Sequence, residues 1–148
     1  MESKLLKISW KILLIISCIL ILMSLVAIFS TKGFVSSDFQ SFGQNWSELL
    51  NNNSQLANYS LLLYREVAVM IVIINMYSIG IILTGYKRGE KWAWFVILAG
   101  TIIGFGFDMF LNINIGNFIM AIGSTVLLVI ALVALSLGVK DILKSASS

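Results

Sequence analysis

The sequence predicts an all-α membrane protein, a four-transmembrane-helix bundle with both termini cytoplasmic and one long external loop. Of its 148 residues, 59% are hydrophobic and 11% are charged. Soluble domains average about 45 to 50% apolar residues and about 25% charged residues. The chain has no proline. Four apolar stretches reach the roughly 20 residues that a helix needs to cross a hydrocarbon core of about 30 Å.

These stretches lie at about residues 12–30, 66–86, 92–111 and 116–139. Because only the loop at about 31–65 is long, residues 1–148 are expected to form a single integral membrane domain. The basic start before the first stretch is also typical of a signal peptide. Its apolar run exceeds the roughly 7 to 15 residues of a signal core, and no A-x-A-like pair precedes Thr31. We therefore expect a retained first helix.

The distribution of lysine and arginine predicts the orientation. Lys32 and Arg65 fall on one side of the spans, and the positive-inside bias places that side, with loop 31–65, outside the plasma membrane. The other eight basic residues are therefore cytoplasmic: Lys4, Lys7, Lys11, Lys87, Arg88, Lys91, Lys140 and Lys144. The aromatic residues expected at the inner interface are Trp10, Tyr86, Trp92 and Trp94.

The loop contains three N-x-S glycosylation acceptors, at Asn45, Asn52 and Asn58. Asn52 and Asn58 are the better candidates, because Asn45 adjoins a segment expected to be helical. The alternative is a chance match in a loop rich in Asn and Ser.

A short helix is expected near Asn45, capped by Ser36, Ser37 or Asp38. It would pack over the outer end of the bundle or lie in the outer interface, and the alternative is a docking face for another subunit. Its apolar face would consist of Phe39, Phe42, Trp46 and Leu49.

The third stretch contains a G-x-x-x-G element, formed by Gly100 and Gly104. Small residues at this spacing let helix backbones approach closely, and lipid offers no hydrophobic drive for helix association. Packing within the bundle is the preferred interpretation, and a dimer face is the alternative.

Residues 86–95, YKRGEKWAWF, predict a tight helical hairpin between the second and third stretches. Gly89 is expected in the left-handed conformation that ends one helix, and Glu90 near the start of the next. The run RGEKWAW at 88–94 resembles a turn of uncharacterised small four-helix prokaryotic membrane proteins. This resemblance implies a shared hairpin and no activity.

Ionisable groups inside a bilayer are costly, so they are candidate ligand or ion sites. Asp108, Arg65 and Glu66 are expected near the outer edge, within reach of Asn112 and Asn114. A structural ion pair is the preferred interpretation, and a cation, metal or polar-ligand site is the alternative.

Asn75 is the strongly polar side chain nearest the midplane. A hydrogen bond to another helix is expected for it. A ligand contact helped by Tyr77 and Ser78 is the alternative.

Several chemistries lack their usual residues. The chain has no histidine, and Cys18 is the single cysteine, expected to be a buried, unreactive hydrophobe. There is no phosphate-binding glycine loop and no G-x-S-x-G elbow. We therefore expect no enzyme, no cofactor and no metal site.

A non-catalytic accessory or scaffolding subunit of a larger membrane protein complex is the function expected from these features. Its partners would be the lipid bilayer and other integral membrane subunits, or a second copy of the chain. No nucleic acid is expected, because the basic residues are the flanks of the spans. The alternatives are a small transporter or channel component, and a lipid- or quinone-binding four-helix membrane protein.

Overall fold

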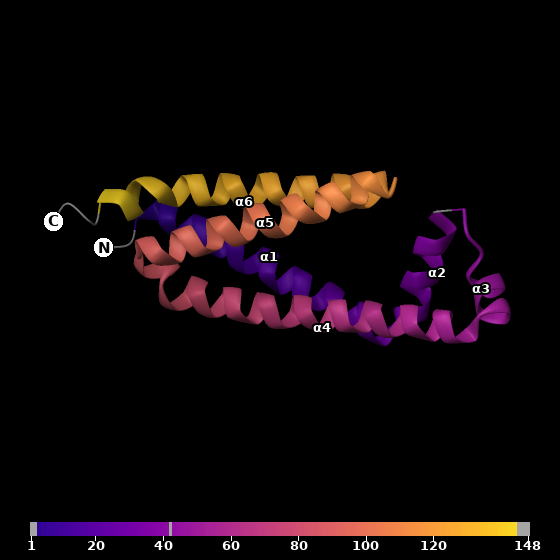
Figure 1. Cartoon of the computed structure of the whole chain (residues 1–148). Helices are drawn as coiled ribbons and strands as arrows, with labels where there is room; N and C mark the ends of the chain where they lie inside the picture. Colours follow the sequence, from indigo (N-terminus) through magenta and orange to yellow (C-terminus); the bar gives the residue numbers. More distant parts are fainter. Residues whose placement is uncertain (1–2, 42, 145–148) are drawn as a thin grey trace. The chain divides into compact units, whose positions relative to one another are not determined.

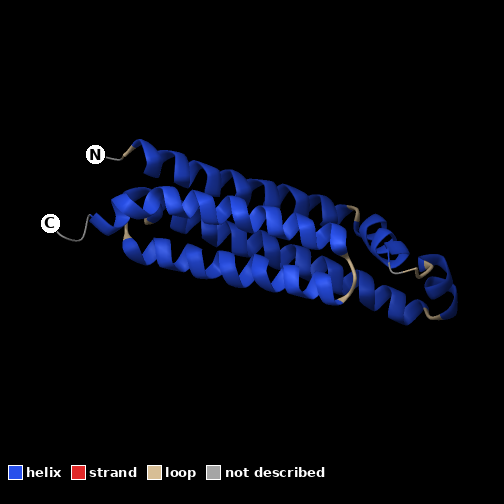
Figure 2. Ribbon diagram, turned by 90° about the horizontal axis from the view of Figure 1, so that it is seen from above, coloured by secondary structure: helices blue, strands red, loops and turns tan. Residues whose placement is uncertain are grey.

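The structure, a computed structural model, describes residues 3–41 and 43–144. Over these residues the chain forms six α-helices and one 3-10 helix, and no strand (Figure 2). The all-α prediction is confirmed.

Four of the helices are long and apolar enough to cross a membrane: α1 (Lys4–Phe29), α4 (Ser54–Thr84), α5 (Lys91–Asn114) and α6 (Phe118–Lys144). They coincide with the four predicted stretches and extend most of them. Large apolar side chains such as Phe29, Ile103 and Ile119 are exposed on them. Apolar surface of this extent suits contact with hydrocarbon or with other apolar helices.

The chain divides into two compact units. Unit 1 contains the first half of α1, up to Cys18, and everything from Met76 onward. Unit 2 runs from Ile19 to Asn75. Helices α1 and α4 pass through both units, which are described separately below.

In unit 1, α5 and α6 lie side by side as a helical hairpin (Figure 1). Gly116, with φ +78°, forms the turn between them, in the left-handed region that glycine adopts without steric strain. Asn117 then caps α6, because its Oδ1 accepts the backbone N–H of Met120.

The turn between α4 and α5 matches the predicted hairpin. Helix α4 continues into the 3-10 helix η1 (Tyr86–Arg88), and Gly89 ends it with φ 76° and ψ 24°. Glu90 is the extended residue immediately before α5. The packing here is tight, since a Cβ on Gly85 would lie 2.6 Å from the Trp92 ring and 2.7 Å from the Ala93 Cβ.

In unit 2, the segment 31–65 contains more helix than expected. It forms α2 (Thr31–Ser41), α3 (Trp46–Asn52) and the first turns of α4. Helix α2 follows α1 after one residue, and the Thr31 hydroxyl donates to carbonyls in the last turn of α1.

The prediction of a single amphipathic helix around Phe39 and Trp46 is wrong. Two helices form instead, α2 and α3, and Gly43 between them has φ +68°. The Phe39 and Trp46 rings instead meet edge to face across the break, with centroids 5.2 Å apart. The residues expected to cap this helix lie inside α2: Ser36, Ser37 and Asp38. Phe42 lies outside the described residues.

Candidate functional site

A buried hydrogen-bonded node lies at the end of unit 1 that contains the α4–α5 turn. The Tyr86 side chain is 0% exposed, and its hydroxyl lies 2.5 Å from the Ser9 hydroxyl. Ser9 donates its own proton to the Ala134 carbonyl of α6, at 2.6 Å. Because a serine hydroxyl has one proton, Tyr86 is the donor to Ser9. The node joins α1, η1 and α6.

Glycine at position 138 makes room for this node. A Cβ there would lie 2.6 Å from the Tyr86 hydroxyl oxygen and 3.2 Å from the Ser9 oxygen. Tyr86 is therefore a packing residue, whereas the sequence suggested an interfacial ring. No sequence pattern predicted that Ser9, Tyr86 and Gly138 would meet, because only the fold brings them together.

Three further hydrogen bonds that involve side chains lie at the same end of unit 1. Ser3 accepts the backbone N–H of Leu6, which caps the start of α1, and donates its own proton to the Asp141 carboxylate of α6. The Trp94 indole of α5 donates to the Leu135 carbonyl of α6, at 3.1 Å. Helices α1, α5 and α6 are thus cross-linked by polar contacts at this end.

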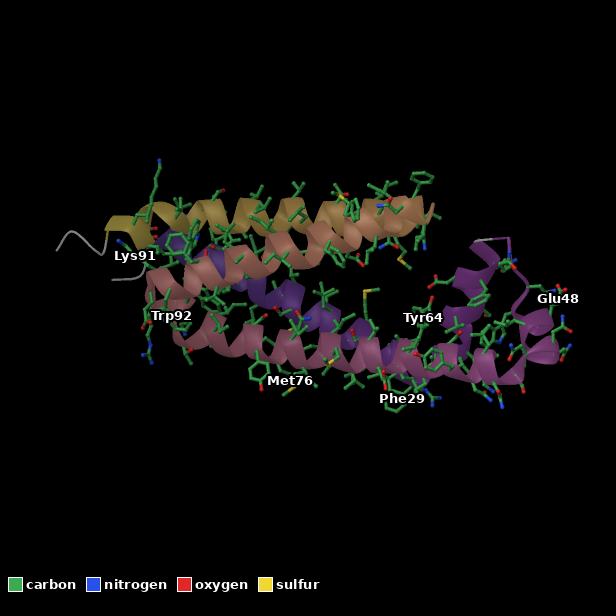
Figure 3. The ribbon with its side chains drawn as sticks, in the orientation of Figure 1. Phe29, Glu48, Tyr64, Met76, Lys91 and Trp92 are labelled. Carbon is green, nitrogen blue, oxygen red and sulfur yellow. The ribbon has the colours of Figure 1, made fainter. Side chains whose placement is uncertain are left out.

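Exposed basic residues gather at the same end of unit 1. Two carboxylates of the described chain lie here, and both accept hydrogen bonds: Glu90 from the Trp92 indole and Asp141 from Ser3. Figure 3 shows Lys91 and Trp92 at the start of α5. The members of this basic rim are all exposed: Lys4, Lys7, Lys11, Lys87, Arg88, Lys91 and Lys140.

Trp10 is the aromatic centre of the rim. The Lys87 ammonium lies 5.0 Å from the centroid of the Trp10 ring, and the Lys11 ammonium lies 5.8 Å from it. Both distances are within the range of cation–π attraction, which extends to about 6 Å. The contact joins α1 to η1 on the surface, next to the buried node.

Asp108 lies near the opposite end of α5. Its carboxylate accepts a hydrogen bond from Ser124 of α6. Asn112 and Asn114 donate to carbonyls of their own helix, at 2.8 Å each.

Arg65, which belongs to unit 2, donates to the Thr31 hydroxyl at 3.2 Å. Glu66 is exposed. Asp108 and Arg65 therefore each have a hydroxyl partner within their own unit, and the predicted ion pair between them stays a prediction.

Asn75 is buried, and its amide donates to the Ile71 carbonyl at 2.9 Å. This bond lies within α4, where a bond to another helix was expected. Tyr77 is 72% exposed and follows two residues later, about 200° around the helix. The two side chains therefore do not face one common ligand.

Gly100 and Gly104 have no packing partner among the described residues. No such atom lies within 4 Å of a Cβ built on either glycine. The residues that α5 buries are Ala93 and Thr101. The interpretation of the two glycines as internal packing stays a prediction. Cys18 is exposed too, where a buried side chain was expected.

The three sequon asparagines are exposed and differ in backbone setting. Asn45 is the extended N-cap of α3, and its Oδ1 accepts the Ser47 N–H at 3.0 Å. Asn52 is the last residue of α3, and Asn58 lies inside α4. Acceptor sites are typical of surface loops, and of the three only Asn45 lies outside a helix. The preference for Asn52 and Asn58 stays a prediction.

Across residues 3–41 and 43–144, no group of three His, Cys, Asp or Glu side chains is placed to hold a metal ion. No protein-family model, curated protein or solved structure matches the chain.

Proposed function

We propose that this chain is a multi-pass plasma-membrane protein that serves as a non-catalytic accessory or scaffolding subunit of a larger membrane protein complex. Four helices of sufficient length and apolarity support the membrane assignment. The basic rim gathers seven cations at one end of unit 1, which supports cytoplasmic termini by the positive-inside bias. The segment 31–65 is then extracellular.

The observation that carries the subunit proposal is the open face of α5. Gly100 and Gly104 lie on a span-length helix with no neighbouring atom within 4 Å in the described chain. Small residues let a second transmembrane backbone approach closely, and such faces are typical of helix–helix interfaces in lipid.

The polar side chains of the spans support the same proposal. Asn75 bonds to its own helix, Ser9 to Tyr86, and Ser124 to Asp108. No buried side-chain nitrogen or oxygen of the described residues lacks a hydrogen-bond partner. These groups already have structural partners, and the open surface is apolar.

Native co-purification tests the proposal. The chain, extracted from its own membrane in mild detergent, should carry a stoichiometric integral membrane partner. Gly100→Leu/Gly104→Leu should lower the recovered partner at least about tenfold, because the bulky side chains keep the helices apart. Gly123→Leu is the matched control, since Gly123 is also an exposed glycine of a span with open space around it.

Recovery of the wild-type chain alone would contradict the subunit proposal. An equal loss of partner in the Gly123 control would show that the face with Gly100 and Gly104 is not the contact.

Orientation is tested separately with single cysteines. Cys18→Ser removes the only native thiol, and a cysteine is then placed at Asn52 or at Lys140. An impermeant maleimide applied to intact cells should label the cysteine at position 52 alone. Labelling at 140 and not at 52 would invert the proposed topology.

One observation favours the alternative of a transport component: Asp108 is an exposed carboxylate on a helix of span length. Ionisable groups in such helices often mark ion pathways. Asp108→Asn keeps the hydrogen bond with Ser124 and removes the charge. Loss of a proton or cation flux in proteoliposomes, with the fold intact, would favour transport over the subunit role.

A further inference from the structure

Two ammonium groups from distant parts of the chain lie over one indole. The Lys87 and Lys11 nitrogens are 5.0 Å and 5.8 Å from the Trp10 ring centroid. Each is attracted by the ring. Their distances to one centroid place the two nitrogens no more than about 11 Å apart, and like charges at such a separation repel. In the part of the chain that the structure describes, neither forms an ion pair with a carboxylate. An anion near both ammoniums would offset this repulsion.

The buried node fixes the backbone next to Trp10 and Lys87. The hydrogen bond between Ser9 and Tyr86 is buried, and Trp10 and Lys87 are the residues that follow its two partners in sequence. The backbones on both sides of the cation–π contact are therefore fixed by the node. A site on fixed elements loses less conformational entropy on binding than one on mobile chains.

The surroundings extend the positive charge along one face of α1. Lys4, Lys7 and Lys11 follow the helical spacing that places residues on the same side. The whole basic rim has seven exposed cations against two described carboxylates, both of which accept hydrogen bonds. The surface therefore selects an anionic ligand.

The proposed topology puts this rim at the cytoplasmic surface of the bilayer. Tryptophan rings favour the depth of the lipid headgroups, and anionic lipids give that surface its negative potential. A phosphate in a headgroup is thus the anion that lies at the depth of Trp10.

We infer that Trp10, Lys11 and Lys87 form a binding site for the headgroup phosphate of an anionic phospholipid. The two ammoniums donate hydrogen bonds to the phosphate oxygens, and the indole packs against the glycerol region of the lipid. A zwitterionic lipid binds more weakly, because its own cation faces the basic rim. The inference rests on the proposed membrane orientation.

The test uses the full chain, purified in a neutral detergent and titrated with dioctanoyl phosphatidylglycerol. Dioctanoyl phosphatidylcholine is the matched lipid, and native mass spectrometry gives the dissociation constants. The wild type should bind the anionic lipid at least about tenfold more tightly than the zwitterionic one. Added salt should reduce the difference, because exposed charges are screened.

Lys11→Gln/Lys87→Gln should weaken binding of the anionic lipid at least about tenfold. Lys91→Gln/Lys140→Gln removes the same charge from the same rim without touching Trp10, and should change the affinity by less than about threefold. Lys11→Arg/Lys87→Arg should retain the preference, which separates loss of charge from loss of fold.

Three results would overturn the inference. One is an equal loss in both glutamine pairs, which reduces the effect to net charge. Another is no preference for phosphatidylglycerol over phosphatidylcholine. The third is binding of inorganic phosphate as tight as that of the lipid. The proposed function is checked independently, because a chain that alkaline carbonate extracts from membranes fails as an integral protein whatever lipid it prefers.

Discussion

Gly138→Ala should destabilise the protein, because the added methyl group would clash with the hydroxyl oxygen of Tyr86. The new Cβ would lie 2.6 Å from the tyrosine oxygen, about 0.8 Å inside the 3.4 Å at which ordinary contact begins. The hydroxyl must move, which breaks its 2.5 Å bond to Ser9 and leaves a buried donor unpaired. That loss is worth about 1 to 3 kcal/mol. Alanine returns up to about 1 kcal/mol of helix propensity, so we expect a net destabilisation of about 1 to 2 kcal/mol.

A double-mutant cycle isolates this contact. Tyr86→Phe alone should lower the free energy of unfolding by about 1 kcal/mol, since it removes one hydrogen bond. In the Tyr86→Phe background the hydroxyl is gone, and Gly138→Ala should then be neutral or stabilising by up to about 1 kcal/mol. The expected coupling is therefore at least about 1 kcal/mol, measured by circular dichroism during unfolding with SDS in mixed micelles.

Gly123→Ala is the control on the same helix, because nothing lies within 4 Å of its added Cβ. It should be neutral or slightly stabilising in both backgrounds. If the effects of Gly138→Ala and Tyr86→Phe instead add to within about 0.5 kcal/mol, the hydroxyl is not what opposes the methyl group.

Three further substitutions test local features. Gly89→Ala should destabilise by about 1 to 2 kcal/mol in the same micelle assay, because φ there is +76°; Gly80→Ala, at an ordinary helical position with open space, should not. Tyr64, labelled in Figure 3, donates to Asp38 at 2.6 Å. Tyr64→Phe removes this bond and should cost about 1 kcal/mol, seen as faster hydrogen exchange in α2 and unchanged exchange in α6. Asn45→Ala removes the cap of α3, worth about 1 kcal/mol, and exchange should rise in α3 alone.

Local sequence patterns were sufficient to predict the four long apolar helices and the α4–α5 turn. A span is recognised by its own composition, and a turn by the conformational freedom of one glycine. Gly89 accordingly has the predicted left-handed conformation, and Glu90 stands immediately before α5. Neither feature depends on what the rest of the chain does.

Features that depend on a distant partner were not predictable. Ser9 and Tyr86 are 77 residues apart, and each suits a simpler role when read alone. For Asn75 and Gly100 the residue type was informative, but the sequence did not say which face of the bundle each would occupy. Asn75 bonds to its own helix, and no described atom that could pack against Gly100 lies within 4 Å of a Cβ built on it.

Polar helices form a third class of missed features. Hydropathy identifies a helix by the apolar length that lipid requires, so it does not detect α2, α3 or the polar beginning of α4. Helical spacing of aromatic residues suggested one helix here. The left-handed backbone at Gly43 ends that periodicity, and the two rings meet across the break instead.

The hydrogen bond between Ser3 and Asp141 brings the first and last described turns of unit 1 together. A short linker can therefore join residues 3 and 144, the first and last that the structure describes, and new ends can be opened at Gly43 without cutting any of the four long helices. In such a circular permutant α1 is made after α6 and no longer first. The permutant would thus separate the order in which the helices are synthesised from the contacts that α1 makes with η1 and α6.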